Sequence, residues 1–266
     1  MDRSTEPTNR VPTARTTTPS DQSTLDRLDR LTDGKTRPPR VEDLPPPPSG
    51  FTAADVEALA TRAIDIAERG VSPDLEGRSP SEAFDFVFAG QYPQTTDYAR
   101  TNSRRATTGY DWEWAWASLY EDPAAAPAIF LTSRWEVARV PGKLDDGSQA
   151  NQLQVTLVTA TEQIVDDKRS GVRAPIVMVR SIILRSFKPR GGPAWWPGVG
   201  VQAEPLLGGK CAPKNDSLLT PSYNDRVLDE DFEKLADVLR EVKDVEEYAS
   251  SDADSIAAYL KKYCDD

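Results

Sequence analysis

The chain has 266 residues, a formal net charge of −11, two cysteines and no histidine. The missing histidine excludes Ser-His-Asp and Cys-His triads, histidine acid–base catalysis and every histidine-containing metal site. Two cysteines alone cannot form a thiolate zinc site, so we expect no metal and no cofactor. The acidic balance repels phosphate backbones, so we also expect no nucleic-acid partner.

The first fifty residues are rich in Thr, Pro, Ser, Arg and Asp and end in V-E-D-L-P-P-P-P-S-G. Such a segment buries too little apolar surface to offset chain entropy, so residues 1–50 are predicted to be a disordered leader with a polyproline linker. The leader lacks the apolar region of a signal peptide, and no run in the chain approaches the ~18 apolar residues of a membrane span. We therefore expect a soluble, cytoplasmic protein, or an extracytoplasmic one if a targeting region is missing from this sequence.

Two amphipathic helices are predicted at the start of an α+β domain spanning residues 51–213. The first runs from Phe51 to Arg69, with Thr52 placed as its N-cap and one apolar stripe. The second runs from about Ser79 to Ala89, with a proline in its first turn. Residues 91–108 are polar and carry no clear pattern.

An aromatic run, Y-D-W-E-W-A-W-A-S-L-Y, extends from Tyr110 to Tyr120. In a helix, Trp112 and Trp116 would share one face; in an extended chain, Trp114 would join them. The run predicts either an aromatic platform for a sugar, a Pro-rich peptide or a planar ligand, or bulky side chains that cap the end of a sheet core.

Three β-branched segments predict an antiparallel meander of at least three strands. They cover residues 128–140, 152–165 and 175–188, and the last two are joined by a charged, Gly-containing connection. In the middle segment the apolar positions change parity between Leu157 and Val158, which requires either a bulge or burial of both faces. The last segment is apolar on both parities, as in a central strand.

Arg180 and Arg185 interrupt the last of these segments. Charged residues are rarely buried without a partner. The two arginines therefore either extend to the margin of the sheet or pair with a carboxylate, or else they line a ligand cavity.

A Gly/Pro-rich stretch, residues 190–213, follows the sheet and carries Trp195 and Trp196 on a loop or a final bent strand. Adjacent tryptophans there form either a contact surface or packing over the sheet. The glycines match no phosphate-binding motif. Residues 214–266 are predicted to be an acidic helical tail, because apolar positions recur at helical spacing and residues 215–266 hold fifteen acidic and six basic residues.

The stretch from Phe51 to about Lys188 resembles the nuclear-transport-factor-two-like superfamily of cone-shaped α+β domains. The features that carry the resemblance are the helices A-L-A-T-R-A-I-D-I-A and S-E-A-F-D-F-V-F and the strands I-F-L-T-S-R-W-E-V, Q-V-T-L-V-T-A-T and I-V-M-V-R-S-I-I-L-R. The resemblance implies N-terminal helices packed on a bent antiparallel sheet. Some members of that superfamily are isomerases or dehydratases with a carboxylate or histidine in the cone, many others are non-catalytic, and the open sheet face often forms a dimer interface.

Three functions are consistent with the sequence. The first is a non-enzymatic binding or assembly module that recognises a protein or a small ligand through an aromatic-rich surface, or dimerises through its sheet face. The second is a small-molecule isomerase or dehydratase with a carboxylate base, for which the candidates are Glu136, Asp85 and Asp111. The third is an exported or envelope-tethered domain of a secretion or transfer system, which a disulfide between Cys211 and Cys264 would support over two free thiols. A high ratio of Arg to Lys with abundant Ala, Pro and Asp is typical of a GC-rich bacterial source.

Overall fold

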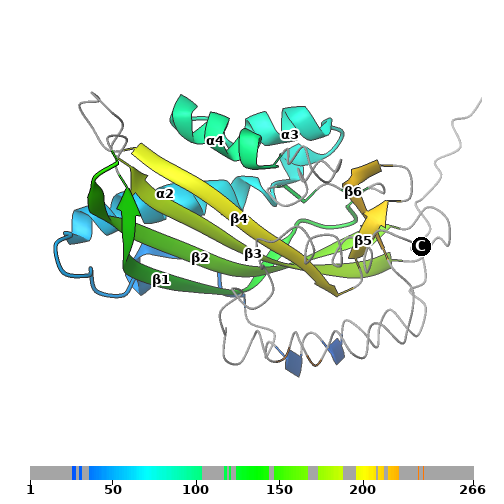
Figure 1. The fold of residues 1–266 in the computed structure, drawn as a ribbon. Coiled ribbons are helices and arrows are strands. Elements are labelled where there is room, and N and C mark those ends of the chain that lie inside the picture. The colour runs from blue at the N-terminus through cyan, green and yellow to red at the C-terminus, as the bar shows by residue number, and fades with distance from the viewer. Residues whose placement is uncertain are drawn as a thin grey trace, which may run out of the picture.

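The computed structural model describes residues 26–27, 30–31, 36–103, 117–118, 120, 124–143, 147–166, 173–187, 196–207, 209–212, 215–221, 233 and 236. Within these ranges the fold is α+β, as predicted, with helices that precede and pack on a long antiparallel sheet (Figure 1). The helical elements are η1 (Val41–Asp43), α2 (Ala53–Arg69), η2 (Pro73–Leu75), α3 (Pro80–Val87) and α4 (Pro93–Ser103). The strands are β1 (Ile129–Lys143), β2 (Gln149–Asp166), β3 (Arg173–Phe187), β4 (Trp196–Leu207), β5 (Gly209–Ala212) and β6 (Asn215–Pro221).

The longest strands form one sheet in the order β1-β2-β3-β4, and every neighbouring pair is antiparallel. The predicted meander of β1, β2 and β3 is confirmed, and β4 adds a strand where the sequence left a loop or a bent strand open. Strands β5 and β6 form a separate two-stranded sheet. The register shifts between Phe130 and Thr132 on β1 and between Val177 and Met178 on β3, and such irregularities bend a sheet.

Both faces of the central strands are buried, which explains the change of apolar parity in β2. Leu157 on β2 lies opposite Ile182 on β3, and both belong to the core beneath the helices. Val158 points to the other face and is only 2% exposed, as is Val179. Because β2 pairs with β3 without a shift in register, burial on both sides, and not a bulge in β2, accounts for the pattern.

Helix α2 begins with a capping box and lies across β2 and β3. Thr52 Oγ1 accepts a hydrogen bond from the Asp55 backbone N–H at 3.2 Å, and the Asp55 carboxylate accepts one from the Thr52 N–H at 2.8 Å. The reciprocal bonds satisfy two of the N–H groups that a helix start leaves without partners. The residues that α2 buries repeat at helical spacing, and they are Val56, Leu59, Ala60, Ala63, Ile66 and Ala67.

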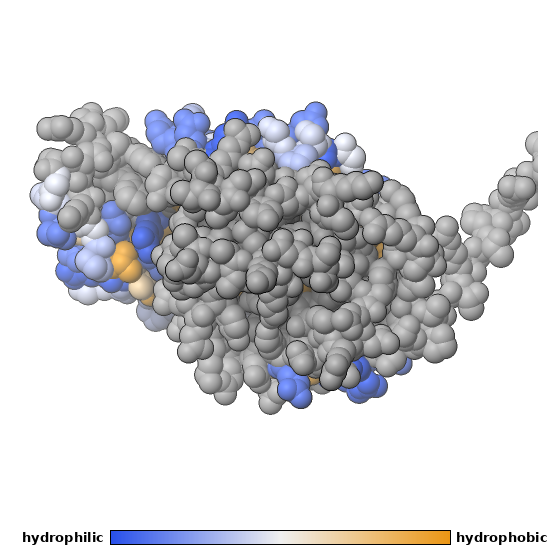
Figure 2. Space-filling view, turned by 45° about the vertical axis from the view of Figure 1, so that its right-hand side comes forward, coloured by the Kyte–Doolittle hydropathy of each residue, from blue (hydrophilic) through white to orange (hydrophobic). Residues whose placement is uncertain are grey.

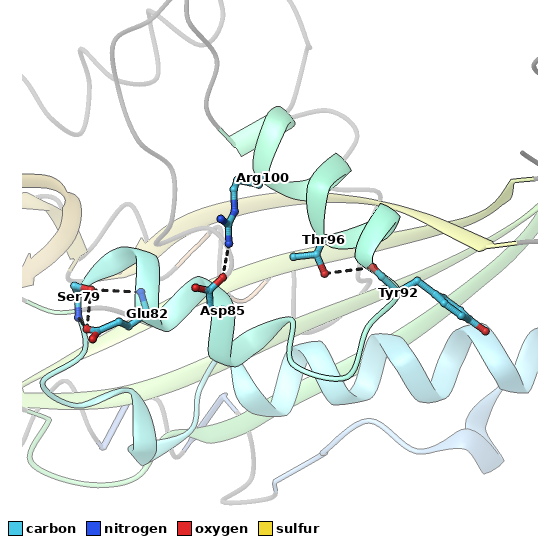
Figure 3. A network of polar contacts seen from close by, with 6 residues as sticks. All are labelled: Ser79, Glu82, Asp85, Tyr92, Thr96 and Arg100. Atoms are coloured by element: carbon cyan, nitrogen blue, oxygen red, sulfur yellow. Dashed lines mark hydrogen bonds and ion pairs between the residues drawn. The ribbon is translucent and has the colours of Figure 1, made fainter.

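Helix α3 has a second capping box, in which the Ser79 N–H donates to the Glu82 carboxylate at 2.9 Å. Asp85 on α3 forms an ion pair with Arg100 on α4, and this pair joins the two helices on their outer side (Figure 3). On the inner side, the rings of Phe84 and Phe88 stack with centroids 4.6 Å apart. The helix is therefore fixed by an apolar inner face and a polar outer one.

Helix α4 is absent from the elements that the sequence predicts. Its residues are mostly polar, and what it buries is small, with Thr95 and Ala99 both 0% exposed. These positions are four residues apart and so share a face, and α4 packs against β4. Two small buried residues produce too narrow an apolar stripe for recognition from periodicity.

Arginines join α2 to the segments that follow it. Arg69, in the last turn of α2, donates to the Phe86 carbonyl at 3.3 Å and to the Ala89 carbonyl at the end of α3. A guanidinium placed at a helix C-terminus satisfies free carbonyls and interacts favourably with the helix dipole. Arg62 lies over the ring of Tyr92 with 4.3 Å to the ring centroid, a cation–π contact.

Residues 36–50, which the sequence assigns to a disordered linker, are ordered against the domain. The Arg37 N–H donates to the Phe130 carbonyl on β1 at 2.9 Å, and Leu44 packs against the core. The composition of the leader does not predict this contact, because two or three well-placed residues are enough to hold a short segment against a domain. Residues 1–25 lie outside the described residues.

Most of the predicted acidic helical tail lies outside the described residues. Its first residues, Asn215–Pro221, form strand β6 and are not helical, which corrects the prediction there. Glu233 and Ala236 are described as well, and both are helical, with Ala236 7% exposed. Cys264 is also outside the described residues, so the structure does not decide between a disulfide with Cys211 and two free thiols.

Figure 2 shows mainly hydrophilic colour over the described helices along the upper edge of the molecule. The large apolar residues with substantial exposure in the described part are Leu31 at 37%, Tyr92 at 43% and Ile129 at 42%. They lie singly, as is normal for a protein surface.

Candidate functional site

The most unusual side chain in the described sheet is Arg180, which is 3% exposed although it is charged. On β3 it lies opposite Thr159 of β2 and Ala203 of β4. It shares a face with Ile182 and Leu184, since side chains alternate along a strand. Those two residues belong to the core under the helices, so Arg180 continues the core face of the sheet toward one end.

Hydroxyl groups surround the Arg180 guanidinium. Nη2 donates to Ser118 Oγ at 3.0 Å, and Nη1 donates to Thr161 Oγ1 at 3.4 Å. The Ser118 N–H in turn donates to the Gly70 carbonyl, just beyond α2, at 2.7 Å. Arg180, Ser118, Thr161 and the neighbouring Tyr120 are called the Arg180 cluster below. The cluster connects the end of the aromatic run to β3, β2 and the end of α2.

Burial sets the electrostatics of the cluster. Desolvation lowers the pKa of Arg180 to about 10, and the nearby Tyr120 opposes the shift in part. Desolvation raises the pKa of Tyr120, while the positive charge of Arg180 and a hydrogen bond with Ser118 act in the other direction. At neutral pH Arg180 is therefore a cation and Tyr120 a neutral phenol.

The segment that carries Ser118 and Tyr120 is held again a few residues later. Ala124 forms a β-bridge with Val165, and the Ala125 N–H donates to the Ile164 carbonyl at 2.7 Å. Gln163 adds a side-chain bond from Nε2 to the Ala126 carbonyl at 3.3 Å. The chain is thus hydrogen-bonded to the rest of the fold at Ser118, before Tyr120, and again at Ala125 and Ala126, after it.

The structure separates the two arginines that the sequence groups as site residues. Arg185 is exposed, and its Nε donates to Gln154 Oε1 at 2.7 Å. Arg180 and Arg185 differ by five positions in a continuous strand, and an odd spacing places them on opposite faces. They do not form one site.

The tryptophans of the predicted aromatic surface are placed only in part. Trp112, Trp116 and Trp195 lie outside the described residues. Trp196 begins β4 opposite Phe187. Ala117 and Ser118, which lie near the end of the aromatic run, are buried. The end of the run is therefore held at the Arg180 cluster.

The carboxylates considered as catalytic bases lie apart from the cluster. Asp85 is on the outer side of α3, paired with Arg100 (Figure 3), and Glu136 on β1 is paired with Arg134. Asp111 lies outside the described residues. The sequence did not single out Glu162 on β2, which is 7% exposed. Its parity places it on the face of the sheet opposite to Arg180.

Sequence reasoning identified Arg180 but not its partners. Thr159 and Thr161 share the parity of Leu157, and this pattern predicts that their hydroxyls face the core. Ser118 carries no such signal, because it is 62 positions from Arg180 in the chain. Chemically, the cluster offers one fixed cation and several hydroxyls, a set that forms and orients hydrogen bonds.

In the part of the chain that the structure describes, no three His, Cys, Asp or Glu side chains gather where they could hold a metal ion. None of the described helices is both long enough and apolar enough to cross a membrane. Comparison of the chain with protein-family models, with curated protein sequences and with solved structures finds no match.

Proposed function

We propose that this chain is a non-enzymatic binding or assembly module that recognises a protein or a small ligand through its aromatic-rich surface. The observation that carries the proposal is the bond from Arg180 to Ser118 Oγ at 3.0 Å. It fixes the end of the aromatic run to the most buried part of the sheet. Binding sites rely on such rigid support, since ordering a flexible segment on binding costs affinity.

The chemistry of the Arg180 cluster also favours binding. Proton transfer at neutral pH is most efficient from groups whose pKa lies near 7. The pKa of Arg180 is about 10 and that of Tyr120 is raised above its usual value near 10, so neither group changes charge near pH 7. The cluster therefore contributes a fixed positive charge and fixed hydrogen-bonding groups, and no group that transfers a proton at neutral pH.

The proposal is tested by ligand screening with the full chain and two variants. Sugars, proline-rich peptides and planar compounds are titrated, and the heat of binding is recorded by isothermal titration calorimetry. We expect binding by the parent chain, and loss of binding in a double variant Trp112→Ala, Trp116→Ala. Tyr92→Phe is the control, because Tyr92 is an exposed aromatic residue that does not belong to the run. Equal binding by the parent and the double variant would refute the proposed surface.

One observation favours the enzyme as the second candidate. Glu162 is a buried carboxylate on a central strand, and a carboxylate is the residue type that serves as a general base in the absence of histidine. A catalytic role requires that Glu162→Gln abolish turnover of a substrate while the chain keeps its unfolding midpoint. Unchanged turnover in that variant would remove the candidate.

A further inference from the structure

A short segment of the leader runs along the edge of the sheet. We call residues 36–44, T-R-P-P-R-V-E-D-L, the strap. It precedes α2 and passes beside β1, where the blue part of the chain approaches that strand (Figure 1). Its first contact is the bond from the Arg37 N–H to the Phe130 carbonyl at 2.9 Å, and its second is from Trp135 Nε1 to the Arg40 carbonyl at 2.9 Å. The strap thus follows β1 in the same direction as the strand, from Phe130 to Trp135.

The first part of the strap, residues 36–40, is built like an extended proline-rich ligand, and the 3-10 helix η1 (Val41–Asp43) follows it. Pro38 and Pro39 have no N–H, so the segment cannot continue as a paired strand after Arg37. The backbone around them is extended, with φ −135° and ψ 144° at Arg40. Pro39 is buried against the domain, although Arg37 and Arg40 on either side of the proline pair are exposed.

The surface under the strap matches the usual way of holding such a ligand. Extended proline-rich segments dock in aromatic-lined grooves, where an indole N–H donates to a backbone carbonyl and proline rings enter apolar pockets. Here Trp135 supplies the indole and is 7% exposed, so its position is fixed by the core. Phe130, whose ring packs against the core, supplies the main-chain acceptor for the Arg37 N–H.

The strap is held by few contacts and is joined to the domain by an exposed connection. Its described hydrogen bonds to β1 are those of Arg37 and Arg40. Ser49 and Gly50, which lead to α2, are exposed, and Gly50 has a positive φ of 93° with no atom near its Cβ position. A segment with so few bonds opens at far lower cost than the core. Its high local concentration, and not its intrinsic affinity, keeps it bound.

We propose that β1 from Phe130 to Trp135 is a binding site for extended proline-rich segments, occupied in this structure by the strap of the same chain. Its partner is a segment with the chemistry of the strap, a proline pair preceded by a free N–H and followed by a carbonyl that accepts from Trp135. When the strap leaves, such a segment from another polypeptide takes its place. The proposal concerns β1 and does not rest on the function proposed for the Arg180 cluster.

The test uses the full chain with a protease recognition sequence inserted between Ser49 and Gly50. After cleavage, a fluorescein-labelled peptide of residues 36–44 is added, and its anisotropy reports binding to the cut protein. We expect the peptide to bind the cut protein and the uncut chain to bind it at least tenfold more weakly, because the tethered strap competes. Size-exclusion chromatography shows whether the cut leader exchanges with the peptide.

Two matched peptides identify the contacts. A peptide with Arg37→Pro lacks the N–H that donates to Phe130 and should bind about tenfold more weakly, as the loss of one hydrogen bond implies. A peptide with Glu42→Gln alters an exposed position and should bind as well as the parent. In the protein, Trp135→Phe should weaken the parent peptide by a similar factor. If that variant does not fold, the peptide variants still decide the question.

The proposal is overturned if the cut leader dissociates and the peptide fails to bind a protein that keeps its circular dichroism spectrum. It is also overturned if cleavage unfolds the domain, since the strap would then be an integral part of the core. Formation of dimers in which each copy receives the strap of the other would support the site, with a second copy as the source of the segment.

Discussion

Replacement of Arg180 by methionine should change stability far less than its burial and charge suggest. Methionine fills a similar volume without a charge, so the substitution removes both the hydrogen bonds and the desolvation cost of the guanidinium. The fall in the pKa of Arg180 from the usual value of an arginine to about 10 corresponds to about 3 kcal/mol of destabilisation at neutral pH, at ~1.4 kcal/mol per pKa unit. Hydrogen bonds to charged groups contribute about 1.5–3 kcal/mol each, so the bonds to Ser118 and Thr161 return roughly 3–6 kcal/mol. We expect Arg180→Met to lower the free energy of unfolding by about 0–3 kcal/mol.

Arg180→Lys keeps the positive charge and removes the planar guanidinium, so it tests the effect of the charge alone. Burial lowers the pKa of a lysine below its usual value near 10.4, so between the two pKa values the folded state binds fewer protons than the unfolded state. Stability therefore rises with pH in that window. The corresponding window for the parent arginine begins at a pH of about 10 and extends upward, and Arg180 adds no pH dependence below it. We expect the deficit of Arg180→Lys relative to the parent to shrink from pH 7 to pH 9, and that of Arg180→Met to stay constant.

The assay is urea unfolding of the full chain at pH 7 and pH 9, followed by circular dichroism, with the m-value checked for a constant unfolding transition. A loss above about 5 kcal/mol for Arg180→Met would refute the balance between desolvation and hydrogen bonding. If Arg180→Lys lowers the free energy of unfolding by the same amount at pH 7 and pH 9, the charge at this position is not buried.

Three further predictions concern the helices and the first hairpin. Arg69→Ala should lower the free energy of unfolding by about 1–2 kcal/mol, because the carbonyls at the end of α3 lose their donor, and Arg69→Lys should recover part of it. Thr52→Ala should cost about 1 kcal/mol through loss of the α2 cap and should raise the pKa of Asp55, which its bonds to Thr52 hold down, as NMR titration would detect. Above the unfolded pKa of Asp55 the cap contributes fully, and its contribution falls as pH drops through the folded value. Gly142→Ala should be destabilising by thermal unfolding, because a Cβ there would lie 2.3 Å from the Gln152 side chain, which is 3% exposed.

Strong periodicity made most of the fold predictable. The positions of α2 and α3 follow from capping residues and apolar stripes, and β1, β2 and β3 follow from long β-branched runs. Helix α4 was not predictable by these means, because the buried residues described on it, Thr95 and Ala99, carry little hydrophobic signal. The strap was missed for a related reason, since its docking depends on one indole bond and one buried proline inside a polar, proline-rich context.

The candidate site was predictable only as a single residue. An arginine within an apolar strand is visible in the sequence, but the sequence left open whether Arg180 extends to the sheet margin, pairs or lines a cavity. The structure places it beside the hydroxyl of Ser118, which is 62 positions away in the chain. Local sequence patterns do not predict contacts between residues so far apart. For Arg185 the deciding fact is parity, because five positions along a strand reverse the face.

The energetics of Arg180 suggest what the residue contributes. An apolar side chain at that position would avoid a desolvation cost of about 3 kcal/mol, so net stability is a weak reason for an arginine there. Directional bonds are a stronger reason, since a guanidinium selects the orientation of Ser118 whereas an apolar contact tolerates several. Ser118 is also tied to the end of α2 through Gly70, so the guanidinium fixes the chain that leaves the aromatic run relative to both layers of the fold. We therefore expect Arg180→Met to alter the fluorescence and ligand response of the aromatic run more than the free energy of unfolding, and a variant with normal ligand binding would contradict this role.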